Sequence, residues 1–216
     1  MPPTPKTGQE AFDQTSRLYM ERLEGKDLAR VARDAGLEFS GGWLSVPLFG
    51  AVHRVGPEGV EGPGGREPGM AVKVLLFRFA LDFPDPVPPP GGWAAYRDFP
   101  DAAPFVGAFA ANVETALARA FSGKPDAFCQ ALADQGGEPP GESLPYDASA
   151  VFTVLPLVPV LALFNDADET LPASCSVLFD RTAPRFLDAE CLAMAGWLLA
   201  DRLMRGLRPP LPELET

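Results

Sequence analysis

Apolar positions change between helical and extended spacing along the 216-residue chain, and glycines or prolines separate the segments. The clearest helical pattern begins near Pro104 and ends before Gly123. Its apolar residues stand four positions apart: Phe105, Phe109, Val113, Leu117 and Phe121. Such a pattern predicts an amphipathic helix whose apolar face packs into the core.

Several other segments also carry helical patterns. Asp27 and Asp188 are typical N-cap residues, and Gly36 and Gly206 are typical of helix ends. Pro68 is suited to the first turn of a helix. The helices predicted in this way cover residues 9–24, 27–35, 68–82, 125–134 and 188–205.

Two regions favour strands. Residues 37–55 contain short apolar runs on either side of Gly41-Gly42, which predicts an antiparallel ribbon with a hairpin turn. Pro47 in this ribbon fits an edge or a bulge, because proline has no N–H to donate to a neighbouring strand. Between residues 83 and 92 the proline-rich sequence FPDPVPPPGG predicts a stiff linker.

The run from Ala150 to Phe164 is the most apolar stretch of the chain. It is too short to span a bilayer as a helix, and its two prolines would break one. We therefore expect a strand buried on both faces, with an irregular backbone between Pro156 and Pro159 and regular pairing from Val160. The chain then turns and returns as a second, antiparallel strand over Cys175–Phe179.

These elements predict an α+β fold, with an antiparallel sheet and helices packed mainly on one face. The length suits a single domain, which we place at residues 9–206. Residues 1–8 are predicted to be a disordered tail, and residues 207–216 a C-terminal tail.

Composition narrows the class of protein. Hydrophobic residues make up 46% of the chain and charged residues 22%, which is ordinary for a globular protein. The formal net charge is −11, without a basic stripe, which argues against nucleic acid and anionic membranes as partners. No segment resembles a signal peptide or a membrane span, so we expect a soluble cytoplasmic protein.

The three cysteines, Cys129, Cys175 and Cys191, are far apart in the sequence, and His53 is the one histidine. This distribution favours free buried thiols and a strand position for His53. It predicts neither a zinc site nor an iron–sulfur cluster, and no cofactor.

The acidic turn after the apolar run is one candidate site. Asp166, Asp168 and Glu169 offer oxygen ligands of the kind that magnesium or calcium binds. The spacing fits no EF-type loop, however, because neither possible starting residue places a glycine at the sixth position. A solvated turn that keeps an apolar hairpin from aggregating is the favoured interpretation.

A second candidate site is the aromatic segment that contains Trp93, Tyr96, Arg97 and Asp98. A guanidinium among aromatic rings can hold a carboxylate or phosphate through two parallel hydrogen bonds. It can equally pin a loop through an internal ion pair, and we favour that structural role. We expect Arg97 to pair with a carboxylate of the acidic turn.

Three tracts carry a family resemblance: GGWAAYRDFPDAAPF (Gly91–Phe105), VLPLVPVLALFNDADETLP (Val154–Pro172) and SVLFDRTAPRFLDAE (Ser176–Glu190). Together they resemble the domain-of-unknown-function family three-seven-eight-six of anaerobic bacteria and archaea. The resemblance extends over residues 37–205. It implies no established activity, but it implies a neighbourhood of corrinoid and iron–sulfur proteins of one-carbon metabolism.

The resemblance and the absence of a nucleophile–base set favour a non-catalytic accessory in that metabolism, which binds a protein partner or a small anionic ligand. The alternative is an enzyme that uses Arg97 and the acidic turn at residues 166–169, with or without a divalent metal. A third hypothesis is a structural subunit of an oligomer, which would expose an apolar patch.

Overall fold

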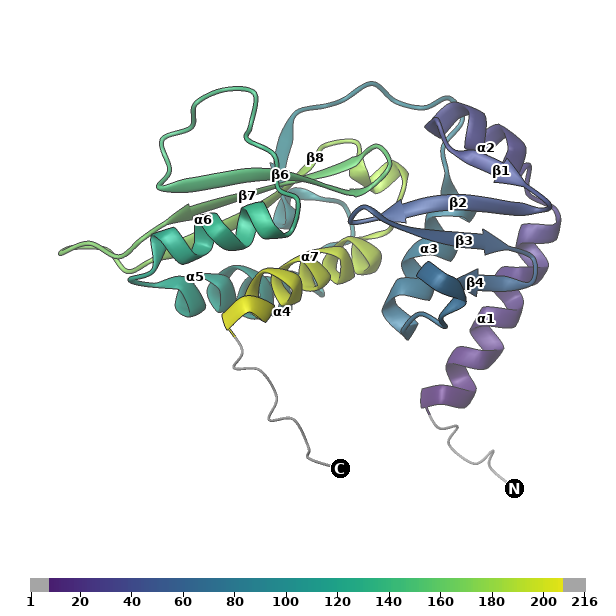
Figure 1. Ribbon diagram of the computed structural model, residues 1–216, viewed down its shortest axis with the longest axis horizontal. Coiled ribbons are helices and arrows are strands. Elements are labelled where there is room, and N and C mark those ends of the chain that lie inside the picture. The colour runs from purple at the N-terminus through teal and green to yellow at the C-terminus, as the bar shows by residue number, and fades with distance from the viewer. Residues whose placement is uncertain (1–7, 208–216) are drawn as a thin grey trace.

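The computed structural model describes residues 8–207, in two lobes that lie side by side along the long axis (Figure 1). The predicted tails lie outside the described residues, apart from Gly8, with which the first helix begins, and Leu207. The N-terminal lobe comprises helices α1 (Gly8–Glu24), α2 (Leu28–Ala35) and α3 (Met70–Asp82), and strands β1 (Glu38–Ser40), β2 (Trp43–Leu48), β3 (Ala51–Gly56) and β4 (Gly59–Glu61).

The N-terminal lobe is built around an antiparallel meander in the order β1-β2-β3-β4. The predicted turn is confirmed, with Gly41 and Gly42 at φ of 58° and 85°, which favour glycine. Pro47 pairs with Val52 beyond the three residues where β1 contacts β2, so it occupies a local edge as predicted. The cap of α2 is also confirmed, because the Asp27 side chain accepts a hydrogen bond from the Arg30 N–H.

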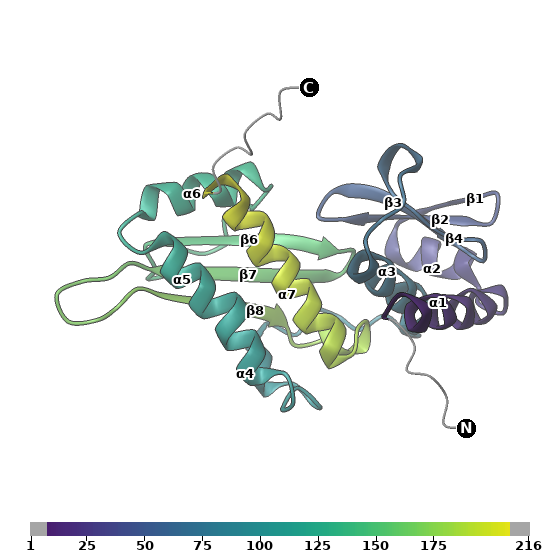
Figure 2. The same cartoon turned by 90° about the horizontal axis from the view of Figure 1, so that it is seen from below.

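The C-terminal lobe holds a second antiparallel sheet in the order β5-β8-β7-β6. Its helices lie on one face of that sheet (Figure 2). The α+β class is confirmed, although the strands form two sheets rather than one. The elements of this lobe are β5 (Trp93–Ala95), α4 (Val106–Phe109), α5 (Thr115–Phe121), α6 (Pro125–Asp134), β6 (Ala148–Leu155), β7 (Val158–Asn165), β8 (Ser174–Asp180) and α7 (Ala189–Met204).

The long apolar run forms two strands rather than the single strand that we expected. The expected irregularity between the prolines is a tight turn at Pro156-Leu157, through which β6 returns as β7. Proline suits the first central position of a turn because its φ is already fixed. Pro159 pairs with Thr153 before β7 begins to pair with β8 at Val160, so its missing N–H falls outside that second ladder.

The predicted helix from Pro104 to Phe121 is present but contains a π-helical turn at Ala110–Glu114, between α4 and α5. Apolar residues four positions apart advance about 40° beyond a full α-helical turn at each step. A wider turn corrects part of that drift. As a result Phe109, Val113 and Phe121 are all buried.

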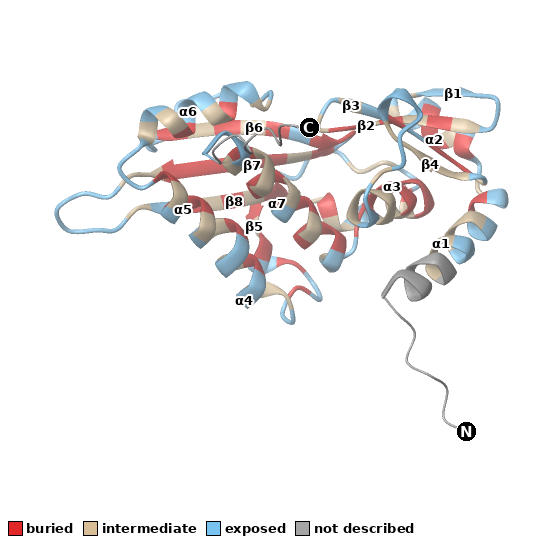
Figure 3. Cartoon of the chain, turned by 60° about the horizontal axis from the view of Figure 1, so that its bottom comes forward, coloured by how far each residue is buried: buried red, intermediate tan, exposed pale blue. Residues whose placement is uncertain are grey.

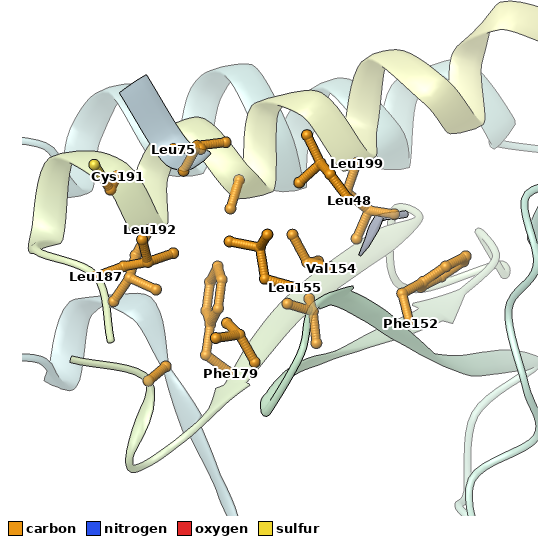
Figure 4. Packing of buried hydrophobic residues seen from close by; sticks show 14 of the residues in the cluster. Leu48, Leu75, Phe152, Val154, Leu155, Phe179, Leu187, Cys191, Leu192 and Leu199 are labelled. Atoms are coloured by element: carbon orange, nitrogen blue, oxygen red, sulfur yellow. The ribbon is translucent and has the colours of Figure 1, made fainter. Parts of the chain in front are cut away.

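The two lobes share a continuous apolar core. Leu48 of β2 lies close to Val154 of β6 and Leu199 of α7, Leu75 of α3 lies along α7 between Cys191 and Leu199, and all of these residues are buried (Figure 4). The Phe49 N–H adds a hydrogen bond of 2.9 Å to the Val154 carbonyl. Burial is heaviest along the central strands of the C-terminal sheet and the inward sides of its helices (Figure 3).

Candidate functional site

The aromatic segment begins on edge strand β5, where half-buried Trp93 pairs with Asp180. Tyr96 is 2% exposed, and its ring stacks on Phe109 with centroids 4.3 Å apart. Its hydroxyl donates to the Ala189 carbonyl at 2.7 Å. Burial raises the pKa of Tyr96 to about 12, so this side chain stays neutral and acts as a core anchor.

Arg97 points away from the core, with 69% of its side chain exposed. Its Nε lies 4.0 Å from Asp98, a weak contact between two exposed groups. Within residues 8–207 it makes no ion pair with Asp166, Asp168 or Glu169, so the predicted pairing is wrong. The physical reason is that β5 ends beside Leu178, in the middle of β8, while the acidic turn lies beyond the start of β8.

A half-buried carboxylate near Arg97 escaped the sequence analysis. Glu114, the last residue of the π-helical turn, accepts a hydrogen bond from the Val177 N–H at 3.2 Å, just past the end of β5. Burial raises the pKa of Glu114, although that hydrogen bond and the charge of Arg97 act in the opposite direction. Glu114 therefore accepts a hydrogen bond from the Val177 N–H of β8, at a position where β5 has ended and no longer pairs with β8.

The acidic turn uses its carboxylates to hold its own backbone. Asp168 Oδ1 accepts hydrogen bonds from the Thr170 N–H, the Thr170 hydroxyl and the Leu171 N–H at 2.7–2.8 Å, and these bonds lower the pKa of Asp168. Asp166 accepts from the Gly123 N–H at 2.7 Å. The turn projects beyond the rest of the lobe (Figure 2) and borders an open, acidic hollow of about 590 Å³.

The last residue of β8, Asp180, is a buried carboxylate that binds the neighbouring loops. Asp180 is 5% exposed and accepts hydrogen bonds from the Gly91 N–H at 3.0–3.1 Å, the Thr182 N–H at 2.8 Å and the Thr182 hydroxyl at 2.6 Å. Burial alone would raise the pKa of Asp180, but these hydrogen bonds, with one from Gly92, lower it. Asp180 thus fastens the linker to the end of the sheet.

Apart from the exposed thiol of Cys129, the remaining reactive side chains are paired or buried. Arg78 of α3 forms an ion pair with Asp188, the N-cap of α7, with Nη2 2.7 Å from Oδ2, and this pair links the two lobes. His53 is on β3, as predicted, and its Nδ1 lies 2.8 Å from the Ala51 carbonyl oxygen. The three cysteines are free thiols; Cys175 and Cys191 are buried, which raises their pKa, and Cys129 is exposed.

Across residues 15–207, whose side chains the structure describes, no three His, Cys, Asp or Glu side chains converge in a way that would hold a metal ion. Among residues 8–207 no helix has the length and apolarity needed to cross a bilayer.

Another cavity, with an apolar wall, lies in the N-terminal lobe. It has a volume of about 380 Å³ and is bordered by α1, α3 and the turn that leads into β4. That volume is within the range of small-molecule sites. Its apolar wall is formed by Met20, Val60 and Phe77. The polar lining residues are Ser16, Arg17, Glu58, Glu67 and Lys73.

One buried polar atom of a residue that borders this cavity has no partner. The Ser16 Oγ is buried and makes no hydrogen bond, whereas buried polar groups are nearly always paired. Lys73 is paired with the exposed carboxylate of Glu67 at the cavity edge. The sequence analysis missed this cavity, because the helical pattern of residues 9–24 says nothing about which loop packs against it.

Most of the chain matches the model of a known protein family. The family model described as Domain of unknown function (DUF3786) matches residues 27–202. The chain belongs to this family. Searches of curated proteins and of solved structures gave no match for it. The DUF3786 segment begins at Asp27, the N-cap of α2, so α1 precedes it. The cavity therefore forms where α1 packs on the DUF3786 segment.

Proposed function

We propose that this DUF3786 protein is a non-catalytic accessory that binds a small ligand in the cavity between α1, α3 and β4. The observation that carries the proposal is the buried Ser16 hydroxyl without a partner. A ligand atom that bonded to this hydroxyl would remove the cost of leaving it unsatisfied. The apolar wall would supply the remaining binding energy through burial of apolar surface.

The arrangement of the other lobe supports a non-catalytic role. Arg97 and the acidic turn do not converge, and Asp166 and Asp168 accept hydrogen bonds from backbone N–H groups. An enzyme that used them together would need them at one site. The proposed setting, anaerobic one-carbon or corrinoid metabolism with a protein partner, rests on what the family resemblance implies.

Native mass spectrometry tests the proposal on the full chain purified anaerobically from its own host. We expect a small-molecule adduct on the wild type. Ser16→Phe should abolish it, because the new ring would occupy the cavity. Leu18→Phe is the matched control, since Leu18 lies on the same helix, is 53% exposed and does not line the cavity.

Circular dichroism and melting temperature must show that both variants fold. A bare wild-type mass would contradict the proposal. So would an adduct that Ser16→Phe retains at the wild-type level.

A further inference from the structure

The charges around the α1–α3–β4 cavity suggest what kind of ligand it takes, on the premise that the proposed function is correct. Four charged side chains line it, two of each sign. Lys73 and Glu67 form an ion pair with each other. Among residues 15–207, whose side chains the structure describes, neither Arg17 nor Glu58 has an ion-pair partner. The cavity thus presents one unpaired cation and one unpaired anion.

These two charges come from different elements. Arg17 projects from α1, and Glu58 from the turn between β3 and β4. The apolar side chains of Met20, Val60 and Phe77 share the same cavity, and Phe77 itself is only 1% exposed. A ligand with a single charge would satisfy one side chain and face a like charge on the other. Arg17 and Glu58 are both exposed at the mouth of the cavity, where water solvates them in the absence of a ligand. A fully apolar ligand would use neither charge and would leave the Ser16 hydroxyl without a partner.

We propose that the cavity binds a zwitterion with an apolar side chain, and that an apolar α-amino acid is the simplest member of this class. The carboxylate of such a ligand pairs with the guanidinium of Arg17, which can donate two parallel hydrogen bonds. Its ammonium group pairs with Glu58. Its side chain packs on Met20 and Phe77, and the Ser16 hydroxyl bonds to one of its polar groups.

Isothermal titration calorimetry of the full chain tests the ligand class with defined probes. The probes are L-leucine, L-methionine and L-phenylalanine. Two analogues of leucine each lack one charge: 3-methylbutylamine lacks the carboxylate, and 4-methylpentanoic acid lacks the ammonium group. We expect at least one amino acid to bind, and each analogue of leucine to bind at least about tenfold more weakly than leucine, since one hydrogen-bonded charge is lost.

Two variants separate the roles of the charges. Arg17→Met should weaken leucine binding at least about tenfold while leaving the affinity for 3-methylbutylamine unchanged. Glu58→Gln should weaken leucine binding while leaving the affinity for 4-methylpentanoic acid unchanged. Arg33→Met and Glu24→Gln are matched controls, because both residues are exposed and neither lines the cavity. Both controls should bind leucine as the wild type does.

The possible failures of this inference and of the proposed function can be told apart. Two outcomes would overturn the zwitterion but leave the cavity as a ligand site. In the first, 4-methylpentanoic acid binds as tightly as leucine. In the second, no amino acid binds, although a co-purified adduct is lost in Ser16→Phe. If the adduct survives Ser16→Phe, the cavity is not the site and both proposals fail. If Arg17→Met and Glu58→Gln each leave leucine affinity unchanged, the charge assignment is overturned.

Discussion

Three carboxylates of the C-terminal lobe accept hydrogen bonds within that lobe, whereas a cavity in the N-terminal lobe is bordered by a buried hydroxyl and two charges that have no ion-pair or hydrogen-bond partner among the described side chains. Asp180, Asp166 and Asp168 bind backbone N–H groups and so hold the linker and the acidic turn in place. Ser16, Arg17 and Glu58 surround a cavity instead. The three tracts that carry the family resemblance all lie at residues 91–190, and these three carboxylates within them hold backbone groups.

The largest effect should come from the buried carboxylate of Asp180. Asp180→Ala leaves several buried donors without an acceptor, so we expect a loss of about 3 kcal/mol in the free energy of unfolding, measured with urea. Asp180→Asn is the matched control, because it retains one acceptor oxygen and should lose less. A loss below about 1 kcal/mol for Asp180→Ala would contradict the view that this lobe depends on its internal hydrogen bonds.

The same residue should make stability depend on pH. The folded pKa of Asp180 is lowered relative to the unfolded chain, so its contribution is fully present above the unfolded pKa of about 3.9. That contribution is lost as the pH falls from there through the folded pKa. The difference between wild type and Asp180→Asn should therefore shrink below about pH 4.

A smaller loss in the free energy of unfolding should follow from adding a methyl group where α7 packs closely against the helix at residues 106–121. A Cβ at Gly196 would lie 2.4 Å from Phe109 Cε2, so Gly196→Ala should cost about 1–3 kcal/mol. Gly107→Ala is the matched control, because nothing lies within 4 Å of its Cβ. The control should gain up to about 1 kcal/mol from helix propensity. Equal effects in urea unfolding would argue against dense packing here.

The turn between β6 and β7 should tolerate, and even favour, a smaller residue. Leu157 adopts φ of 64°, a region that is strained for leucine, and is 42% exposed. We expect Leu157→Gly to stabilise the protein by up to about 1 kcal/mol, net of the greater freedom of glycine in the unfolded chain. A fall in melting temperature would show that the Leu157 side chain makes a necessary contact.

Arg97→Ala should change the free energy of unfolding by about 0–1 kcal/mol, since its contact with Asp98 is exposed. A double-mutant cycle with Asp168 should give no coupling, because the two residues form no ion pair. A coupling energy above about 0.5 kcal/mol would show that Arg97 and Asp168 interact, and so that the two segments share one site.

No loss of stability is expected from the N-terminal cavity. Ser16→Ala should raise the free energy of unfolding of the ligand-free chain by up to about 1 kcal/mol, because it removes a buried hydroxyl that bonds to nothing. Leucine affinity should nevertheless fall. A clear destabilisation without ligand would indicate a structural role for this hydroxyl.

Local signals explain which parts of the fold were predictable. Asp27, Gly36 and Asp188 act through neighbouring backbone groups, so the helices they bound were predicted closely. The turn at Pro156-Leu157 was less visible, because an apolar run that folds back on itself has no polar residue to mark the reversal. β5 was missed because three residues acquire strand pairing only from β8, far along the chain.

The candidate site was less predictable for the same reason. The acidic turn attracted attention as a local cluster, yet local bonds are what occupy Asp168. The cavity depends on how α1 packs near α3 and the turn before β4. Ser16, Glu58 and Phe77 are brought together only by that packing, and no spacing in the sequence reports it.

The bond between Gly91 and Asp180 joins residues 89 positions apart, and this separation has a consequence for the order of folding. The hairpins β6–β7 and β7–β8 close short loops and can form early. Edge strand β5 has no pairing partner until β8 is in place, because β8 is the strand on which it lies. We expect the linker to dock last, so a nascent chain released from the ribosome only as far as β7 would leave Trp93 and its neighbours unpaired.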